Sequence, residues 1–226
     1  MVLRSAVPDT LPDAAPAPLV LVAPGVLDPL LDDALSQYRR ACDGSRRGEP
    51  YLPRCWALLL GRMDQGALRV QELRWAGNVR ESDEAVLEEF SEVIVPCFGS
   101  SYTNGRRGYW CDPAELLKII REAESQGLDV LGSIHMHADM HRFWPEHANG
   151  QLLSHRPTAM DEYLFRNGGW PLNMICHLES FDDDVALSVG AWAPPAFEDE
   201  NGRATAMEVR LSLGSSSVPA ESRRPE

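Results

Sequence analysis

The stretch Val130-Leu-Gly-Ser-Ile-His135-Met-His137 is an apolar run that ends in two histidines. A short apolar run of this kind predicts a buried strand. Side chains two positions apart in a strand point to the same face of a sheet, so both imidazoles can face one point in space. Thr158 and Asp161 follow at an expected helix start and add a carboxylate. Two imidazoles and one carboxylate are a zinc set that leaves a fourth position open for water.

Each half of this pattern has a plain structural reading when taken alone. A His-x-His pair at a strand end is more often structural than metal-binding, and Thr-x-x-Asp is an ordinary capping box at a helix start. Five of the six histidines lie between residues 135 and 155. This clustering favours a metal site, although it does not identify which histidines are ligands.

The composition is that of an ordinary globular protein with an acidic surface. Lys and Arg number 21 and Asp and Glu number 34, so the net charge is −13, which argues against nucleic-acid or anionic-membrane partners. No apolar run approaches the roughly 18 residues that span a bilayer, and no signal peptide is visible. The five cysteines are scattered without a Cys-x-x-Cys pair. Reduced thiols and a cytoplasmic location are therefore expected.

One domain is expected over residues 19–200, between a Pro/Ala-rich leader (1–18) and a mostly disordered tail (201–226). Helix signals predict one helix from Asp28 to near Asp43-Gly44 and another from Asp112, its cap, to Gly127. A third helix is expected to start near Thr158. The acidic segment 81–92 and the Gly/Ser-rich segment 98–107 are interpreted as an excursion over the surface. Patterning predicts strands at 19–23, 56–61, 67–75, 128–137, 172–178 and 185–191, with a hairpin turn at 63–66.

The order of these elements, with His135-x-His137 and then Thr158-x-x-Asp161, resembles the JAMM (MPN, Mov34-like) zinc metalloprotease family over about residues 25–195. The resemblance implies an α/β (α+β) fold: a cytidine-deaminase-like sandwich with a mixed, mostly antiparallel sheet flanked by helices. It also implies Zn²⁺ as cofactor, with His135, His137 and Asp161 as its ligands. Thr158 stands where the family has an oxyanion-stabilising serine.

The sequence departs from the family pattern in three places. Residues 138–157 are longer than the family's usual spacing, which indicates an insertion, and Ala138 replaces the usual proline. Most importantly, Arg54 stands where the catalytic glutamate is expected. Glu49 is the nearest upstream carboxylate and is the candidate general base, while Glu72 and Glu146 are other possible donors. Glu49 lies an odd number of residues from that position, so a bulge or loop near residues 50–53 would have to redirect it.

The resemblance implies cleavage after the C-terminal Gly-Gly of a ubiquitin-like or sulfur-carrier protein. Zinc would lower the pKa of a bound water from about 15.7 towards about 7, and a carboxylate would move its proton to the leaving amine. The altered glutamate position keeps two other hypotheses open: a catalytically silent metal-binding scaffold, and a zinc amidohydrolase for a small molecule. The insertion suits a substrate lid or a structural cover equally well, and the sequence leaves the partner and the oligomeric state open.

Overall fold

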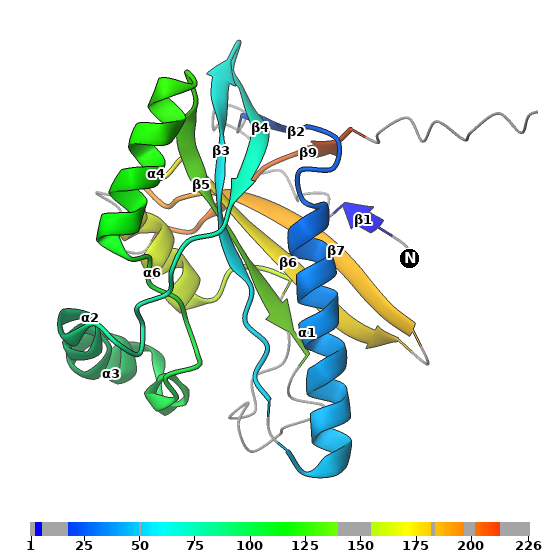
Figure 1. Cartoon of the computed structure of the whole chain (residues 1–226), viewed down its shortest axis with the longest axis vertical. Coiled ribbons are helices and arrows are strands. Elements are labelled where there is room, and N and C mark those ends of the chain that lie inside the picture. Colours follow the sequence, from blue (N-terminus) through cyan, green and yellow to red (C-terminus); the bar gives the residue numbers. More distant parts are fainter. Residues whose placement is uncertain are drawn as a thin grey trace, which may run out of the picture.

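The computed structural model describes residues 3–5, 18–49, 51–139, 155–181, 184–196 and 202–212. Figure 1 shows the elements in these ranges. In chain order they are β1 (Leu3–Ser5), β2 (Leu19–Val22), α1 (Asp28–Arg47), β3 (Trp56–Asp64), β4 (Ala67–Arg74), α2 (Glu84–Glu89), the π-helix η1 (Phe90–Ile94), α3 (Val95–Phe98), the 3-10 helix η2 (Ser100–Thr103), α4 (Pro113–Ser125), β5 (Asp129–Ala138), α6 (Ala159–Gly168), β6 (Leu172–Phe181), β7 (Asp184–Ala193), β8 (Thr205–Ala206) and β9 (Val209–Leu211).

The strands form one mixed, mostly antiparallel sheet in the order β1-β7-β6-β5-β3-β4-β2-β9, with β8 paired to β7. β3 pairs antiparallel with β4 and β5, and β6 pairs antiparallel with β7, while β5 and β6 run parallel. Only two residues separate β8, which pairs with β7, from β9, which pairs with β2. The sheet is therefore strongly curled, and the predicted α/β fold class is confirmed.

Helices cover both faces of this sheet. Successive side chains of β3 point to opposite faces, and its first six residues are all buried, so both faces must be covered. Cys55, Ala57 and Leu59 pack in the main core together with Leu30 and Tyr38 of α1. The side chains of the alternate positions point to the other face, where they meet α4. Their cluster contains Trp56, Leu58, Leu60, Ile119 and Ala123. In Figure 1, α1 and α4 accordingly lie on opposite sides of the strands, with α6 on the α4 side. Both histidines of β5 lie on this second face, because His135 pairs with Trp56.

Most predicted elements are confirmed, with shifted bounds. The hairpin turn lies at Gln65 and Gly66, whose φ angles of 49° and 77° suit a two-residue turn between twisted strands. Asp112 caps α4 by accepting from two backbone amides. The prediction for α1 is corrected at both ends: Leu27 precedes the helix without a side-chain cap, and the helix runs on to Arg47. Gly44 is needed inside the helix, because a Cβ there would lie 2.4 Å from the Glu49 carbonyl oxygen.

The interpretation of residues 81–92 as a surface excursion is corrected. Asp83 caps α2, and the chain continues through η1 and α3 as a helical lobe comprising residues 83–103. Val86, Phe90 and Ile94, spaced four apart, are buried against Met160 of α6. The many charges between them obscured this apolar stripe, which is the usual signature of a packed helix.

Both expected chain ends contribute strands to the sheet. Residues 3–5 of the predicted leader form β1 and pair with β7, and β8 and β9 lie past the expected domain end at residue 200. The rest of the leader and residues 213–226 of the predicted tail lie outside the described residues. Within the described part of the chain, no helix is long and apolar enough to cross a bilayer.

Candidate metal centre

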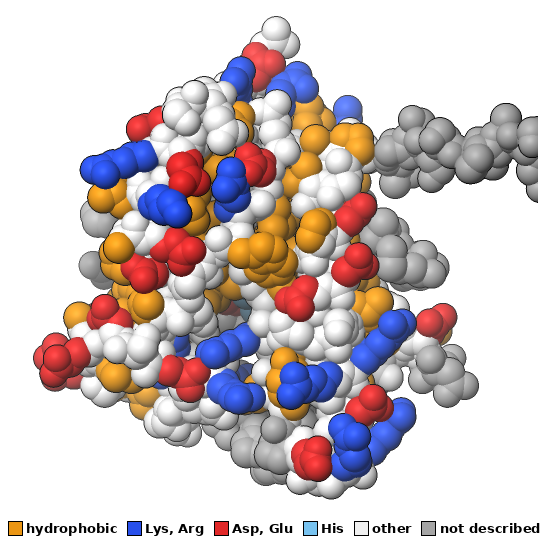
Figure 2. Space-filling view, in the orientation of Figure 1, with side chains coloured by type: hydrophobic (Ala, Val, Ile, Leu, Met, Phe, Trp, Pro, Cys, Tyr) orange, Lys and Arg blue, Asp and Glu red, His pale blue; other side chains and the backbone are white. Residues whose placement is uncertain are grey.

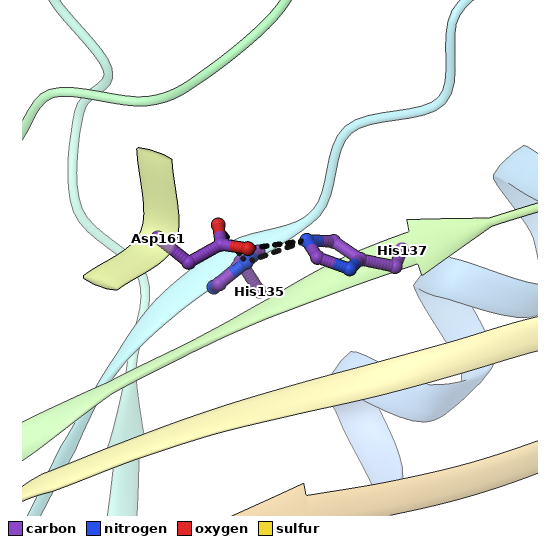
Figure 3. A group of neighbouring side chains, drawn as sticks. All are labelled: His135, His137 and Asp161. Atoms are coloured by element: carbon purple, nitrogen blue, oxygen red, sulfur yellow. Dashed lines mark hydrogen bonds and ion pairs between the residues drawn. The ribbon is translucent and has the colours of Figure 1, made fainter. Parts of the chain in front are cut away.

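His135 and His137 at the end of β5 meet Asp161 from the first turn of α6, as Figure 3 shows. The two histidine Nε2 atoms are 3.1 Å apart. His135 Nε2 lies 3.2 Å from Asp161 Oδ1, and His137 Nε2 lies 3.4 Å from Oδ2. One ligand atom from each residue can be chosen so that all lie within 4.8 Å of one another. Tetrahedral ligands at zinc–ligand distances near 2.0–2.1 Å are about 3.3 Å apart, so the three side chains fit a divalent metal ion.

The helix cap of α6 fixes the carboxylate of Asp161. Thr158 donates to Asp161 Oδ2 through both its backbone N (2.6 Å) and its hydroxyl (2.7 Å), and Asp161 N donates back to the Thr158 hydroxyl at 3.3 Å. This reciprocal capping box is the one expected from Thr-x-x-Asp. Asp161 can therefore serve as a helix-capping residue and as a metal ligand at once. Both hydrogen bonds from Thr158 go to Oδ2, and Oδ1 accepts none from the cap.

The electrostatics of the site suit metal ligation. Burial would by itself raise the pKa of the Asp161 carboxyl, but the charge and hydrogen bonds of His137 and His135 hold it well below its usual range. Burial lowers the pKa of His135, which outweighs the opposing effect of Asp161. An ionised carboxylate and a neutral imidazole are the protonation states in which these groups bind metals.

Two further aromatic side chains contact the histidines and were not assigned roles from the sequence. The Tyr109 hydroxyl lies 3.3 Å from His135 Nδ1. His177 of β6 lies directly beside His137 in the β5–β6 register, with the two rings perpendicular and their centroids 5.6 Å apart. His177 is buried, its Nε2 has no hydrogen-bond partner among the residues that the structure describes, and burial is the main cause that lowers its pKa to about 3. Tyr109 lies in the loop before α4, in a segment (residues 109–113) that resembles the family's approach to the site, and His177 lies in another strand; neither position by itself predicts contact with the histidines.

Of the two candidate carboxylates that the structure describes, Glu49 and Glu72, neither belongs to this group. Glu49 is exposed near the end of α1, and its carboxylate lies 3.7 Å from Arg47. Glu72 pairs with Arg74 and lies opposite Leu60, four residues along β3 from the residue that pairs with His135, or about 13 Å. Glu146 lies outside the described residues.

Arg54 occupies the place next to the metal centre. Trp56 pairs with His135 and Cys55 accepts a backbone hydrogen bond from Met136, so Arg54 continues this register opposite His137. Its guanidinium makes a 3.0 Å ion pair with Glu81. A carboxylate from the segment before α2, that of Glu81, thus pairs with the arginine at this position.

The site is accessible at one edge. The His137 side chain is 18% exposed, whereas those of His135 and Asp161 are 7% and 9% exposed. Figure 2 shows histidine surface at the bottom of a recess, with Lys or Arg side chains along its lower edge. The expected insertion, residues 138–157, follows His137 directly. Its second residue, Asp139, is buried and accepts from the Tyr38 hydroxyl at 2.5 Å and from Ser180 N at 3.0 Å. Residues 140–154 lie outside the described residues.

Comparison with protein-family models and with curated proteins gives no match to this sequence. Any functional assignment therefore rests on the sequence motif and the structure. What it contains is a mixed, curled sheet that carries a buried His-His-Asp group able to hold a metal ion.

Proposed function

We propose that this protein is a zinc-dependent hydrolase of amide bonds, a peptidase or isopeptidase of the JAMM type. The observation that carries the proposal is the His135, His137 and Asp161 group, in which one ligand atom from each residue lies within 4.8 Å of the others and the two histidine Nε2 atoms are 3.1 Å apart. Three protein ligands with a partly exposed edge suit a catalytic zinc, whereas structural zinc sites use four protein ligands.

The residues of the chain have separate parts in this proposal. His135, His137 and Asp161 hold the metal, and the Thr158 cap keeps the carboxylate aimed at the two imidazoles. When bound, zinc supplies Lewis-acid activation of water and of the scissile carbonyl. Glu49 receives no role here, because its carboxylate is exposed beside Arg47.

A ubiquitin-like or sulfur-carrier protein that ends in Gly-Gly is the proposed substrate. Glycine is the residue that lets a backbone come closest to a surface, so an extended Gly-Gly tail suits the approach to a recessed metal. The ligand motif, carried by β5 and then α6, resembles that of the JAMM family, and this resemblance supports a substrate of this kind. The partial exposure of His137 gives such a tail access to the metal.

A catalytically silent metal-binding module is the second candidate. The position of Arg54 favours it, since an arginine paired with Glu81 cannot accept a proton as the family's glutamate does. A small-molecule amidohydrolase is the third candidate, and a closed pocket at the metal would favour it over an open groove.

The test combines zinc binding with cleavage. Wild type and the variants His137→Ala, Asp161→Asn and Glu49→Gln are compared, with His155→Ala as a matched control outside the ligand group. We expect wild type to bind one zinc and to cleave a ubiquitin-like fusion after Gly-Gly. His137→Ala and Asp161→Asn should weaken zinc binding by roughly 100-fold or more, because the first removes a ligand atom and the second replaces the anionic carboxylate with a neutral amide. His155→Ala should leave zinc affinity within a few-fold of wild type.

The outcomes separate the candidates. A wild type without zinc overturns every metal-based proposal. Zinc binding without turnover of any fusion leaves the silent module or a small-molecule substrate, and hydrolysis of small acyl-amides then distinguishes these two. Loss of turnover in Glu49→Gln at unchanged zinc affinity would restore Glu49 as the base.

A further inference from the structure

We infer that Tyr109 positions the zinc ligand His135 by accepting a hydrogen bond from its Nδ1 atom. This inference deepens the proposed function and rests on it. The side chain comes from the loop between η2 and α4, and nothing in the ligand motif predicts it. It is a positioning residue, because it acts through His135 and does not reach the metal.

The two ring nitrogens of His135 have different neighbours and therefore different roles. Nε2 faces His137 Nε2 at 3.1 Å and Asp161 Oδ1 at 3.2 Å, so Nε2 is the atom that would bind the metal. A neutral imidazole that ligates through one nitrogen carries its proton on the other. That proton is on Nδ1, where the Tyr109 oxygen lies 3.3 Å away.

A buried ring N–H needs an acceptor. The His135 side chain is 7% exposed, so water has little access to Nδ1. Leaving a buried donor unpaired carries a free-energy penalty, and that penalty would oppose metal binding through Nε2. Hydrogen-bond partners of this kind fix ring orientation and make the metal-binding nitrogen more basic.

Tyr109 is itself held in place on two sides. Its ring stacks on Trp56, with centroids 5.2 Å apart and an interplanar angle of 28°, and it lies 5.0 Å from the His135 ring. The following residues are tied to an adjacent segment: Asn78 pairs with Cys111, and its side chain accepts from Trp110 N. The hydroxyl therefore has a fixed position relative to β5.

The side chain also stays neutral. Burial is the main cause that raises the pKa of the Tyr109 hydroxyl, and the charge of Asp161 raises it further. A neutral phenol keeps its oxygen available to accept a hydrogen bond from His135 Nδ1.

Tyr109→Phe tests the inference, because it removes the oxygen and keeps the ring on Trp56. We expect the variant to bind zinc 10–100-fold more weakly in a chelator competition. The unfolding midpoint of the metal-free protein should fall by only about 2–4 °C. In the zinc-loaded wild type, the Nδ1 proton of His135 should give an NMR signal that exchanges slowly with water, and in the variant this signal should shift and exchange faster.

The matched control is Tyr163→Phe, which removes a hydroxyl that donates to Glu89 on the helical lobe. We expect it to change stability by a similar amount and zinc affinity by less than 2-fold. Equal zinc affinities of Tyr109→Phe and wild type would overturn the inference and leave the proposed function standing. An equal loss of affinity in both variants would overturn it as well. A wild type that binds no zinc would overturn both proposals together.

Discussion

At the scale of single residues, the metal centre depends on groups whose protonation is set by burial and by neighbouring side chains. The two histidines hold the pKa of Asp161 well below its usual range, and burial lowers the pKa of His135, so both shifts favour the protonation states that bind a divalent ion. On the opposite face of the sheet, burial likewise favours the neutral form of a thiol. Cys176 is buried in the main core, and burial raises its pKa to about 12.

Alkaline pH should therefore destabilise the protein through Cys176. Below pH 9.0, the ordinary pKa of a thiol, the folded and unfolded chains both keep the proton. Between pH 9 and about 12 only the unfolded chain loses it, so the free energy of unfolding falls by up to about 1.4 kcal/mol per pH unit. Urea unfolding at several pH values measures this slope.

Cys176→Ala should lower the free energy of unfolding at neutral pH by about 1 kcal/mol, because it leaves a small cavity, but it should flatten the alkaline slope. Cys97→Ala, at an exposed position, is the control and should keep the wild-type slope. An unchanged slope in Cys176→Ala would assign the alkaline effect to other groups, such as the buried Cys55 thiol, whose pKa is also raised by burial.

At the scale of elements, the β5–β6 pair aligns the whole site. Parallel pairing places His137 beside His177 and Gly132 beside Leu172. The two strands approach so closely at Gly132 that an added Cβ would lie 1.5 Å from the Leu172 carbonyl oxygen. The glycine in Leu-Gly-Ser is thus required by the neighbouring strand, not by a turn.

Gly132→Ala should disrupt this pairing, because the clash is with backbone that cannot turn away. We expect a loss of about 3 kcal/mol or more in the free energy of unfolding, together with weaker zinc binding as the His135 and His137 register shifts. Gly168→Ala is the control, since a Cβ there meets only ordinary contacts with Trp170 and alanine is favoured in helices. Similar stabilities of both variants, measured by urea unfolding, would contradict the close approach.

At the scale of the molecule, the segment 202–212 joins parts that are distant in the sheet order. β8 pairs with β7, β9 pairs with β2, and the side chain of Met207 is buried between them. Glu162, next to Asp161, accepts from Arg203 at 2.7 Å and from Ala204 N at 3.2 Å. The segment thereby supports both the curl of the sheet and the helix that carries a metal ligand.

Deleting residues 202–226 should lower the free energy of unfolding by at least about 3 kcal/mol. The change exposes the apolar surface that Met207 covers and leaves the carboxylate of Glu162, a buried residue, without its partners. Deleting residues 214–226 is the control, because every contact named above stays in place. Equal denaturant midpoints for the two deletions would show that β8 and β9 contribute little.

By itself, the sequence determined the local features of this protein. The apolar run before His135, the cap signals at Asp112 and Thr158, and the hairpin turn all act over a few residues, so pattern and residue type were sufficient to predict them. The same reasoning selected His135, His137 and Asp161, because a strand end and a helix start each present their ligands locally.

Only the tertiary structure decided which distant residues meet this group. Tyr109 and His177 reach the histidines from a loop and from another strand, and Arg54 meets Glu81 across 27 positions of sequence. The stripe of buried residues in the helical lobe and the sheet pairing of 205–211 likewise depend on surfaces formed elsewhere in the chain. Such contacts follow from packing between elements, which no short stretch of sequence specifies.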